Sequence, residues 1–125
     1  MVGTGLMADL IIRDFALCDN TELAAIVTRN VEAAKPKLAA WGVDVPLVGS
    51  LEEALHDPSI DLIYVASPHS EHYWMTKAAL EAGKHVLCEK AFMMNQSEAV
   101  ELTKLAKEKG LFLMEAMWTK FNPLM

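Results

Sequence analysis

A turn that could hold a phosphate group lies at the start of the chain. The stretch "GTGLMA" covers residues 3–8 and matches the pattern G-x-G-x-x-A. In this pattern Gly3 would make a tight turn, Gly5 would let the backbone approach a pyrophosphate, and Ala8 would let a helix lie close against a sheet. Leu6 and Met7 open that helix, whose first N–H groups have no partner within it and can hold phosphates. An ordinary glycine turn is the alternative, because the pattern alone is weakly specific.

The segment from Thr28 to Asn30 is placed to choose between dinucleotides. Arg29 lies 24 residues beyond Gly5, near where an acidic residue normally binds the ribose of NAD. Here the first acid after this segment is Glu32. An arginine can bind a 2'-phosphate bidentately and stack on adenine, and Thr28 and Asn30 offer neutral donors. We therefore expect NADP, with NAD less favoured. Alternatively, Arg29 only lies at a helix start, where the helix dipole disfavours a cation.

Glu89 and Lys90 could take part in proton transfer. They directly follow the apolar run "HVLC", which is typical of a buried strand. Open parallel sheets bind ligands at the carboxyl ends of their strands, so both side chains would lie at such an edge. A lysine in that place can act as a general acid or base. The alternative is a solvated lysine at a strand end.

Short apolar runs alternate with helical patterns, and these elements must position the polar groups. The runs predict strands at 24–28, 60–66, 85–88 and 111–117. Ser50 with Glu53 forms a capping box for the helix "LEEALHD". Asn95 with Glu98 forms a similar box for "QSEAVELTKLAKEK", which Gly110 ends. The strand–helix alternation implies parallel strands joined by right-handed crossovers, hence an α/β, three-layer, Rossmann-type fold with a doubly wound, mostly parallel sheet.

Two details of the helices can be predicted further. The helix before Gly83 has one apolar stripe, made of Met75, Ala78, Ala79 and Ala82. Pro36 lies within the helical stretch "VEAAKPKLAAW" and removes one backbone hydrogen bond, so we expect that helix to be kinked or shortened.

The first strand of this fold is nearly missing from the sequence. In the doubly wound order 3-2-1-4-5-6 the first strand is central, and Met1 and Val2 supply only ~7 Å of it. We expect the N-terminus to be truncated or its start misassigned. The alternative is that two residues suffice because something else fills the gap.

Composition excludes several classes of protein. The chain has 125 residues, which suits one domain spanning 1–125. Its formal charge of -6, without a run of lysine or arginine, argues against nucleic acid or an acidic membrane surface as partner. Cys18 and Cys88 cannot form a disulfide framework, which fits the reducing cytoplasm, and the four histidines lack the spacing of metal ligands. We see neither a long apolar span nor a signal peptide.

Three stretches of the chain together resemble one enzyme family. They are "GTGLMA", "SLEEALHDPSIDLIYVASPHSEHYWMTKAALEAGKHVLCEKAF" and "GLFLMEAMWTKFNP". In combination they are similar to the nucleotide-binding half of the glucose-fructose oxidoreductase and inositol dehydrogenase (Gfo/Idh/MocA) family. The second and third of these stretches most resemble the branch of the family that contains dimeric dihydrodiol dehydrogenase and NADP-dependent D-xylose dehydrogenase.

The resemblance implies roles for residues of this chain. Lys90 would lie beside the nicotinamide and help to position and deprotonate a substrate hydroxyl, and Glu89 would lie near the nicotinamide ribose. The loop of Ser67, Pro68 and His69 would lie along the cofactor. His72 matches a histidine of the family, with a helix-cap partner as the alternative. Trp118 matches an aromatic residue that borders the substrate pocket, with plain core as the alternative, whereas Trp41 is assigned to packing alone.

The sequence departs from the family pattern in two ways. Ala91 replaces the proline that follows the lysine, so the rigid φ that helps to aim Lys90 is lost. The chain also stops at "FNPLM", about where the family's second α/β domain begins; that domain completes the substrate pocket and makes oligomer contacts. We expect the NADP-binding part of a dehydrogenase acting on a secondary alcohol or sugar hydroxyl, of dihydrodiol or aldose type. The alternatives are a non-catalytic dinucleotide-binding module or inactive remnant, and an interaction protein without nucleotide.

Overall fold

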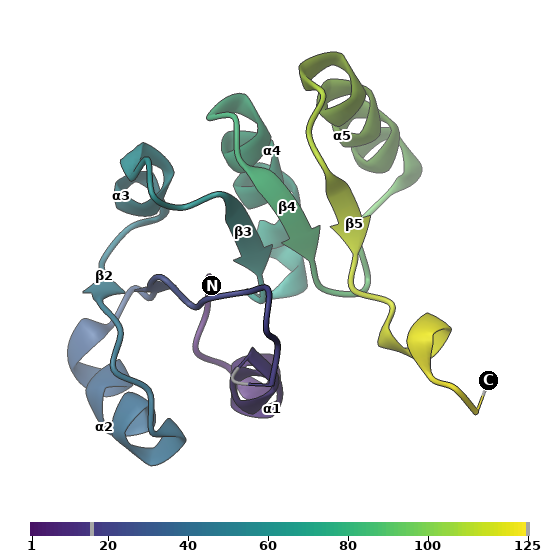
Figure 1. Cartoon of the computed structure of the whole chain (residues 1–125). Helices are drawn as coiled ribbons and strands as arrows, with labels where there is room; N and C mark the ends of the chain where they lie inside the picture. The colour runs from purple at the N-terminus through teal and green to yellow at the C-terminus, as the bar shows by residue number, and fades with distance from the viewer. Residues whose placement is uncertain (16, 125) are drawn as a thin grey trace.

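The computed structural model describes residues 1–15 and 17–124 and has three layers (Figure 1). The helices are α1 (Leu6–Phe15), α2 (Val31–Trp41), α3 (Leu51–His56), α4 (His72–Glu81) and α5 (Gln96–Lys109). The strands are β1 (Ile26–Val27), β2 (Leu47–Val48), β3 (Leu62–Val65), β4 (His85–Cys88) and β5 (Leu113–Glu115). Short 3-10 helices occupy His69–Glu71 (η1) and Trp118–Phe121 (η2). None of the helices described is long and apolar enough to cross a bilayer.

The sheet has the doubly wound order that the sequence predicts. β1 pairs with β2, and β3, β4 and β5 pair in that order, all in parallel. Val2 forms parallel bridges to Val27 on one side and Val65 on the other, so it joins the two parts. The resulting order is β2-β1-Val2-β3-β4-β5, which corresponds to 3-2-1-4-5-6. The predicted Rossmann-type fold is therefore confirmed.

Residues 1–3 take the central position of the sheet. The Val2 N–H donates to Tyr64 O at 2.8 Å, and the Val27 N–H donates to Met1 O at 2.8 Å. Burial lowers the pKa of the Met1 ammonium group to about 6, and this group donates to Ala25 O. A cavity of about 650 Å³, lined in part by these residues, lies beside them. Two residues thus make the central pairs, and nothing that the structure describes fills the adjoining gap.

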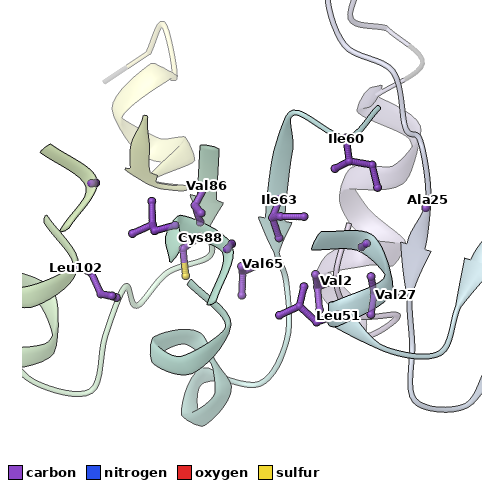
Figure 2. Packing of buried hydrophobic residues seen from close by; sticks show 14 residues of the cluster. Val2, Ala25, Val27, Leu51, Ile60, Ile63, Val65, Val86, Cys88 and Leu102 are labelled. Atoms are coloured by element: carbon purple, nitrogen blue, oxygen red, sulfur yellow. The ribbon is translucent and has the colours of Figure 1, made fainter. Parts of the chain in front are cut away.

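Alternate strand residues face two separate clusters of buried side chains. Val2, Val27, Val65 and Val86 belong to one cluster, with side chains of α3, α4 and α5 (Figure 2). Ile26 and its neighbours Met1, Tyr64 and Ala66 belong to the other cluster, with side chains of α1 and α2. This alternation follows from the two-residue period of a strand, and it produces the three layers.

Both predicted helix caps are confirmed. The Ser50 hydroxyl accepts from the Glu53 N–H at the start of α3, and the Asn95 side chain accepts from the Glu98 N–H at the start of α5. Gly110 ends α5 with a φ of 64°, in the left-handed region that glycine reaches without strain. These helix starts are fixed by contacts three residues apart, which explains why sequence could locate them.

The elements differ from the sequence-based predictions at three places. Of the stripe predicted for α4, Ala79 is fully buried and Met75 and Ala78 pack partly buried against the core, whereas Ala82 is exposed. His72, Thr76 and Leu80 complete the buried face, so two polar residues also face the interior. α2 is not shortened at Pro36 but continues to Trp41, since Pro36 and the nearby Glu32 are exposed and water can solvate the carbonyl left without a donor. β2 was not predicted, because Leu47 and Val48 form only a short apolar pair directly after Pro46.

Candidate cofactor site

A groove of about 780 Å³ lies where α1 begins and where β1 and β3 end. Its walls come from residues 2–7, 27–30, 49–51 and 66–68, with further side chains from η1 and α4. Nine of the residues predicted from the sequence line it together: Gly3, Gly5, Leu6, Met7, Thr28, Arg29, Asn30, Ser67 and Pro68. Carboxyl ends of parallel strands meet at this edge, which is where open sheets bind ligands.

The two glycines of the turn have different surroundings. Gly3 has a φ of 105°, and a Cβ built there would lie 2.7 Å from Ala66 O, so the fold itself requires glycine. A Cβ on Gly5 would have no heavy atom within 4 Å. Gly5 therefore leaves open space above the backbone, and an incoming group can approach closely. Ala8 is fully buried where α1 packs against the sheet.

The first N–H groups of α1 are available to an anion. Those of Gly5, Leu6 and Met7 make no hydrogen bond to any residue that the structure describes. Such groups at a helix start, together with the helix dipole, favour a phosphate. Open space at Gly5 and unpaired donors beside it fit a pyrophosphate, so the residues present suit a dinucleotide. Lys37 of α2 donates to Thr4 O at 2.5 Å and so brings a positive charge to this turn.

Arg29 is the charged side chain of the segment that follows β1. It is exposed, lines the groove, and makes no ion pair with a described carboxylate. Thr28 is buried, and its Oγ1 accepts from the Asn30 N–H at 3.4 Å. The Asn30 Oδ1 accepts from the Ala33 N–H at 3.0 Å and caps α2. Of the three residues, Arg29 is therefore best placed to meet a ligand.

Glu89 lies beneath the strand ends rather than in the groove. It is 4% exposed, and its Oε1 accepts from the Tyr64 hydroxyl at 2.5 Å. Burial, and then the hydrogen bond to Glu89, raise the pKa of Tyr64 far above its usual value, so the phenol stays a donor. The second carboxylate oxygen accepts from the Lys90 N–H at 3.1 Å. Tyr64 thus holds Glu89, the residue that precedes Lys90, and no sequence pattern had indicated this role of Tyr64.

Lys90 itself is exposed and does not line the groove. It begins the loop after β4, and the peptide bond that joins it to Ala91 is cis. The neighbouring residue Glu89 donates its N–H to Val65 O at 2.9 Å, which fixes the start of this loop against β3. Lys90 therefore stands at the strand-end edge that the sequence predicted.

His72 is not exposed to the groove, contrary to the expectation of a cofactor-binding residue. It is 1% exposed, and carbonyl oxygens of the loops after β3 and β4 surround its ring. The alternative of a helix-cap partner is also wrong, because the ring contacts these loops instead of the α4 backbone. His69 is exposed in η1, and its ring lies edge-on to that of His72 at a centroid distance of 5.3 Å.

The two tryptophans discussed in the sequence analysis, Trp118 and Trp41, lie in different environments. Trp118 lies in η2, which runs away from the sheet after β5 (Figure 1), and it is 63% exposed, so the alternative of plain core is wrong. Trp41 packs with the cluster beneath α1 and donates from Nε1 to Asp9 Oδ1 at 2.9 Å, which confirms its packing role.

Sequence reasoning missed several groove residues. Ser50 and Leu51 line the groove after β2, and Trp74 and Met75 line it from α4. The first pair was missed as site residues because β2 was not recognised. Trp74 carried no pattern of its own, and only its place on α4 brings it to the groove.

Comparisons with known proteins agree with this geometry. The model of an oxidoreductase family with an NAD-binding Rossmann fold, GFO_IDH_MocA, matches residues 1–117. D-xylose 1-dehydrogenase (NADP(+)) of Hypocrea jecorina is 53% identical over 81 residues, which are 65% of this chain and 21% of that protein. Trans-1,2-dihydrobenzene-1,2-diol dehydrogenase of Sus scrofa is 34% identical over 98% of this chain and 37% of that protein.

Solved structures are similar over nearly the whole chain. KijD10, a 3-ketoreductase from Actinomadura kijaniata in complex with TDP-benzene and NADP, has a TM-score of 0.88 at 29% identity, over 98% of this chain and 39% of that one. Biliverdin reductase from Synechocystis, in complex with biliverdin and NADP+, has a TM-score of 0.81 at 32% identity, over 91% of this chain and 35% of that one. The chain thus spans between about a fifth and two fifths of the length of these proteins.

Proposed function

We propose, from the premise that this chain belongs to the GFO_IDH_MocA oxidoreductase family, that it binds NADP for a dehydrogenase acting on a secondary alcohol or a sugar hydroxyl. The observation that carries the proposal is the groove at the strand ends, which brings the glycine turn, Arg29 and Ser67 together. The named relatives act on a sugar and on a dihydrodiol, and both substrates contain secondary hydroxyl groups. The activity is proposed for the whole protein, because this chain matches only part of each relative.

Each part of the groove has a task in this proposal. The open space at Gly5 and the N–H groups of Leu6 and Met7 would hold the pyrophosphate. Arg29 would bind the 2'-phosphate, since its side chain is exposed in the groove and a guanidinium matches phosphate geometry. The loop of Ser67, Pro68 and His69 would border the other half of the dinucleotide. NADP is also named with one relative and with both solved structures above.

Lys90 is the proposed catalytic group. When bound, the nicotinamide accepts or donates the hydride. Lys90 would take the hydroxyl proton during oxidation and return it during reduction, because its amine is exposed at the strand-end edge. Glu89 would keep the start of this loop in place through its contacts with Tyr64 and the Lys90 N–H.

Substrate contacts, including any made by Trp118, would be completed by a second α/β domain, which would also support a homo-oligomer. Both Cys18 and Cys88 are free thiols, which fits a reducing, cytoplasmic setting. No nucleic acid or membrane partner is proposed, since the formal charge is -6.

The test is a calorimetric titration of NADP and NAD against wild type and Arg29→Ala. We expect the variant to lose about 2 kcal/mol of NADP affinity, roughly 30-fold, and to bind NAD nearly as before, because a charge-assisted contact is lost only where the phosphate exists. Lys35→Ala is the matched control: it removes one positive charge from a side chain that pairs with Glu32 on α2. Equal losses for both cofactors in Arg29→Ala would contradict the assignment of Arg29 to the phosphate.

A further inference from the structure

The two walls of the groove differ in chemistry. On the side of α1 the wall is the glycine turn, with N–H groups at the helix start that have no partner among the described residues. On the side of α3 and α4 the wall is largely apolar and is made by Leu51, Met75 and Trp74. Leu51 is buried and Met75 packs half-buried against the same core cluster, whereas Trp74 is 46% exposed. Trp74 is therefore the part of this apolar wall that a ligand can cover.

Glu71 holds one edge of the Trp74 indole. The indole Nε1–H donates to Glu71 Oε2 at 2.7 Å, across one turn at the start of α4. This N–H is the only polar group of the side chain, so the indole needs no hydrogen bond from a ligand. Among the described residues, no other aromatic ring or cation stacks on the indole. Trp74 thus offers a flat apolar face whose orientation is restrained by Glu71.

Charges in the groove indicate which part of a dinucleotide would meet Trp74. Arg29 and the start of α1 are the positive ends of the groove, and they suit phosphates. Glu71 instead brings a carboxylate to the wall of α4, and a carboxylate repels a phosphate. A part of the cofactor without phosphate should therefore lie against this wall.

The position of Arg29 identifies that part as the adenine base. The Thr28 N–H donates to Val48 O at 3.0 Å, so the segment of Arg29 lies beside segment 49–51, which belongs to the apolar wall. The 2'-phosphate and the adenine are bonded to adjacent carbons of one ribose, so a phosphate bound by Arg29 keeps the adenine close to this wall. The nicotinamide half would extend the other way, toward Lys90, which does not line the groove.

We propose that Trp74 binds the adenine of the cofactor by stacking its indole on the base, and that Glu71 holds the indole in place for this contact. This inference rests on the proposed function. Stacking uses the face of the base and not the 2'-phosphate, and NADP and NAD contain the same base. Trp74 would therefore strengthen the binding of both dinucleotides, whereas Arg29 would distinguish between them.

The experiment is a calorimetric titration of NADP and NAD against variants of the full chain. In Trp74→Ala we expect both affinities to fall by the same factor, about tenfold, because the stacked face is lost for either cofactor. Trp74→Phe keeps an aromatic face and should bind within about threefold of wild type. Trp74→Leu keeps apolar bulk without a ring and should recover little of the loss. Arg29→Ala, measured beside them, should weaken NADP alone.

Phe112→Ala is the matched control for the loss of an exposed aromatic side chain. Phe112 is 49% exposed, precedes β5 at the opposite edge of the sheet, and does not line the groove, so both affinities should stay within about twofold of wild type. Unchanged NADP affinity in Trp74→Ala, a loss confined to NADP, or equal binding by the Phe and Leu variants would overturn the stacking role. If Trp74→Ala does not fold, the comparison of Trp74→Leu with Trp74→Phe decides. If wild type binds neither cofactor, the proposed function itself fails, whereas a normal response to Arg29→Ala with none to Trp74→Ala refutes this inference alone.

Discussion

One methyl group added at Gly5 should weaken cofactor binding and leave the stability of the fold nearly unchanged. In Gly5→Ala the new Cβ meets no heavy atom within 4 Å, and Gly5 is not among the glycines with positive φ. The fold can therefore accept alanine without strain. Its free energy of unfolding should stay within about 1 kcal/mol of wild type, because alanine fits the native backbone there and restricts the unfolded chain.

The same methyl group should obstruct the pyrophosphate. It would occupy the space through which a phosphate reaches the N–H groups of Gly5, Leu6 and Met7. Hydrogen bonds to a charged group contribute about 1.5–3 kcal/mol each. Loss of one or two of them predicts a reduction in NADP affinity of about 2–4 kcal/mol, or roughly 30- to 1,000-fold.

Gly3→Ala is the matched control, because the two glycines lie two residues apart and receive the same methyl group. At Gly3 the φ of 105° is unfavourable for alanine, and the new Cβ would lie 2.7 Å from the backbone oxygen of Ala66. Strain of this kind costs about 1–3 kcal/mol before the clash is added. Gly3→Ala should therefore unfold at clearly lower urea concentration than Gly5→Ala.

Two measurements on each variant are sufficient: urea unfolding and calorimetric titration of NADP. We expect Gly5→Ala to be stable and binding-deficient, and Gly3→Ala to be unstable. Normal NADP affinity in Gly5→Ala would refute the assignment of this turn to the pyrophosphate. Equal destabilisation by both substitutions would refute the distinction between an open and a crowded glycine.

Three other predictions concern separate parts of the molecule. In the whole protein Lys90→Met should lower kcat by ~100-fold or more and leave NADP affinity nearly unchanged, because the amine serves proton transfer. A near-normal kcat would show that Lys90 is only a solvated charge at a strand end. Burial raises the pKa of the Cys88 thiol to about 12, whereas Cys18 is exposed, so an aromatic disulfide reagent at pH 8 should label one thiol per folded chain and two after unfolding; fast labelling of both would contradict the burial. An engineered extension of six to eight apolar residues before Met1 should raise the melting temperature by filling the adjoining cavity, and an unchanged value would argue against a strand in that place.

Local signals made part of the structure predictable. The caps of α3 and α5 depend on Ser50 with Glu53 and Asn95 with Glu98, contacts that span three residues. β4 was predicted with its observed bounds, since its apolar run is short and ends at Glu89. The glycine pattern also placed residues 3–7 in one groove with Arg29, because a helix start and a strand end meet there in any sheet of this order.

Non-local contacts explain what was missed. β2 exists because Leu47 and Val48 pair with β1, and neither residue stands out in the sequence. The buried face of α4 was predicted only in part, because a search for apolar periodicity does not find a polar residue such as His72, whose hydrogen-bond partners lie up to 20 residues away. Tyr64 and Glu89 are 25 residues apart and meet only through the pairing of β3 with β4. Contacts of this kind can be recognised once the folded structure shows which distant segments lie side by side.

The most direct test of the central claim is a map of backbone amide shifts on adding NADP to the isotope-labelled chain, whose mass of 13.8 kDa suits NMR. We predict shifts in residues 3–8, 28–30 and 67–69 and around Lys90, because the cofactor would lie along the strand ends. The exposed face of α5, which includes Val100 and Thr103, should not respond. Shifts centred on α5, or no shifts at saturating NADP, would contradict the account.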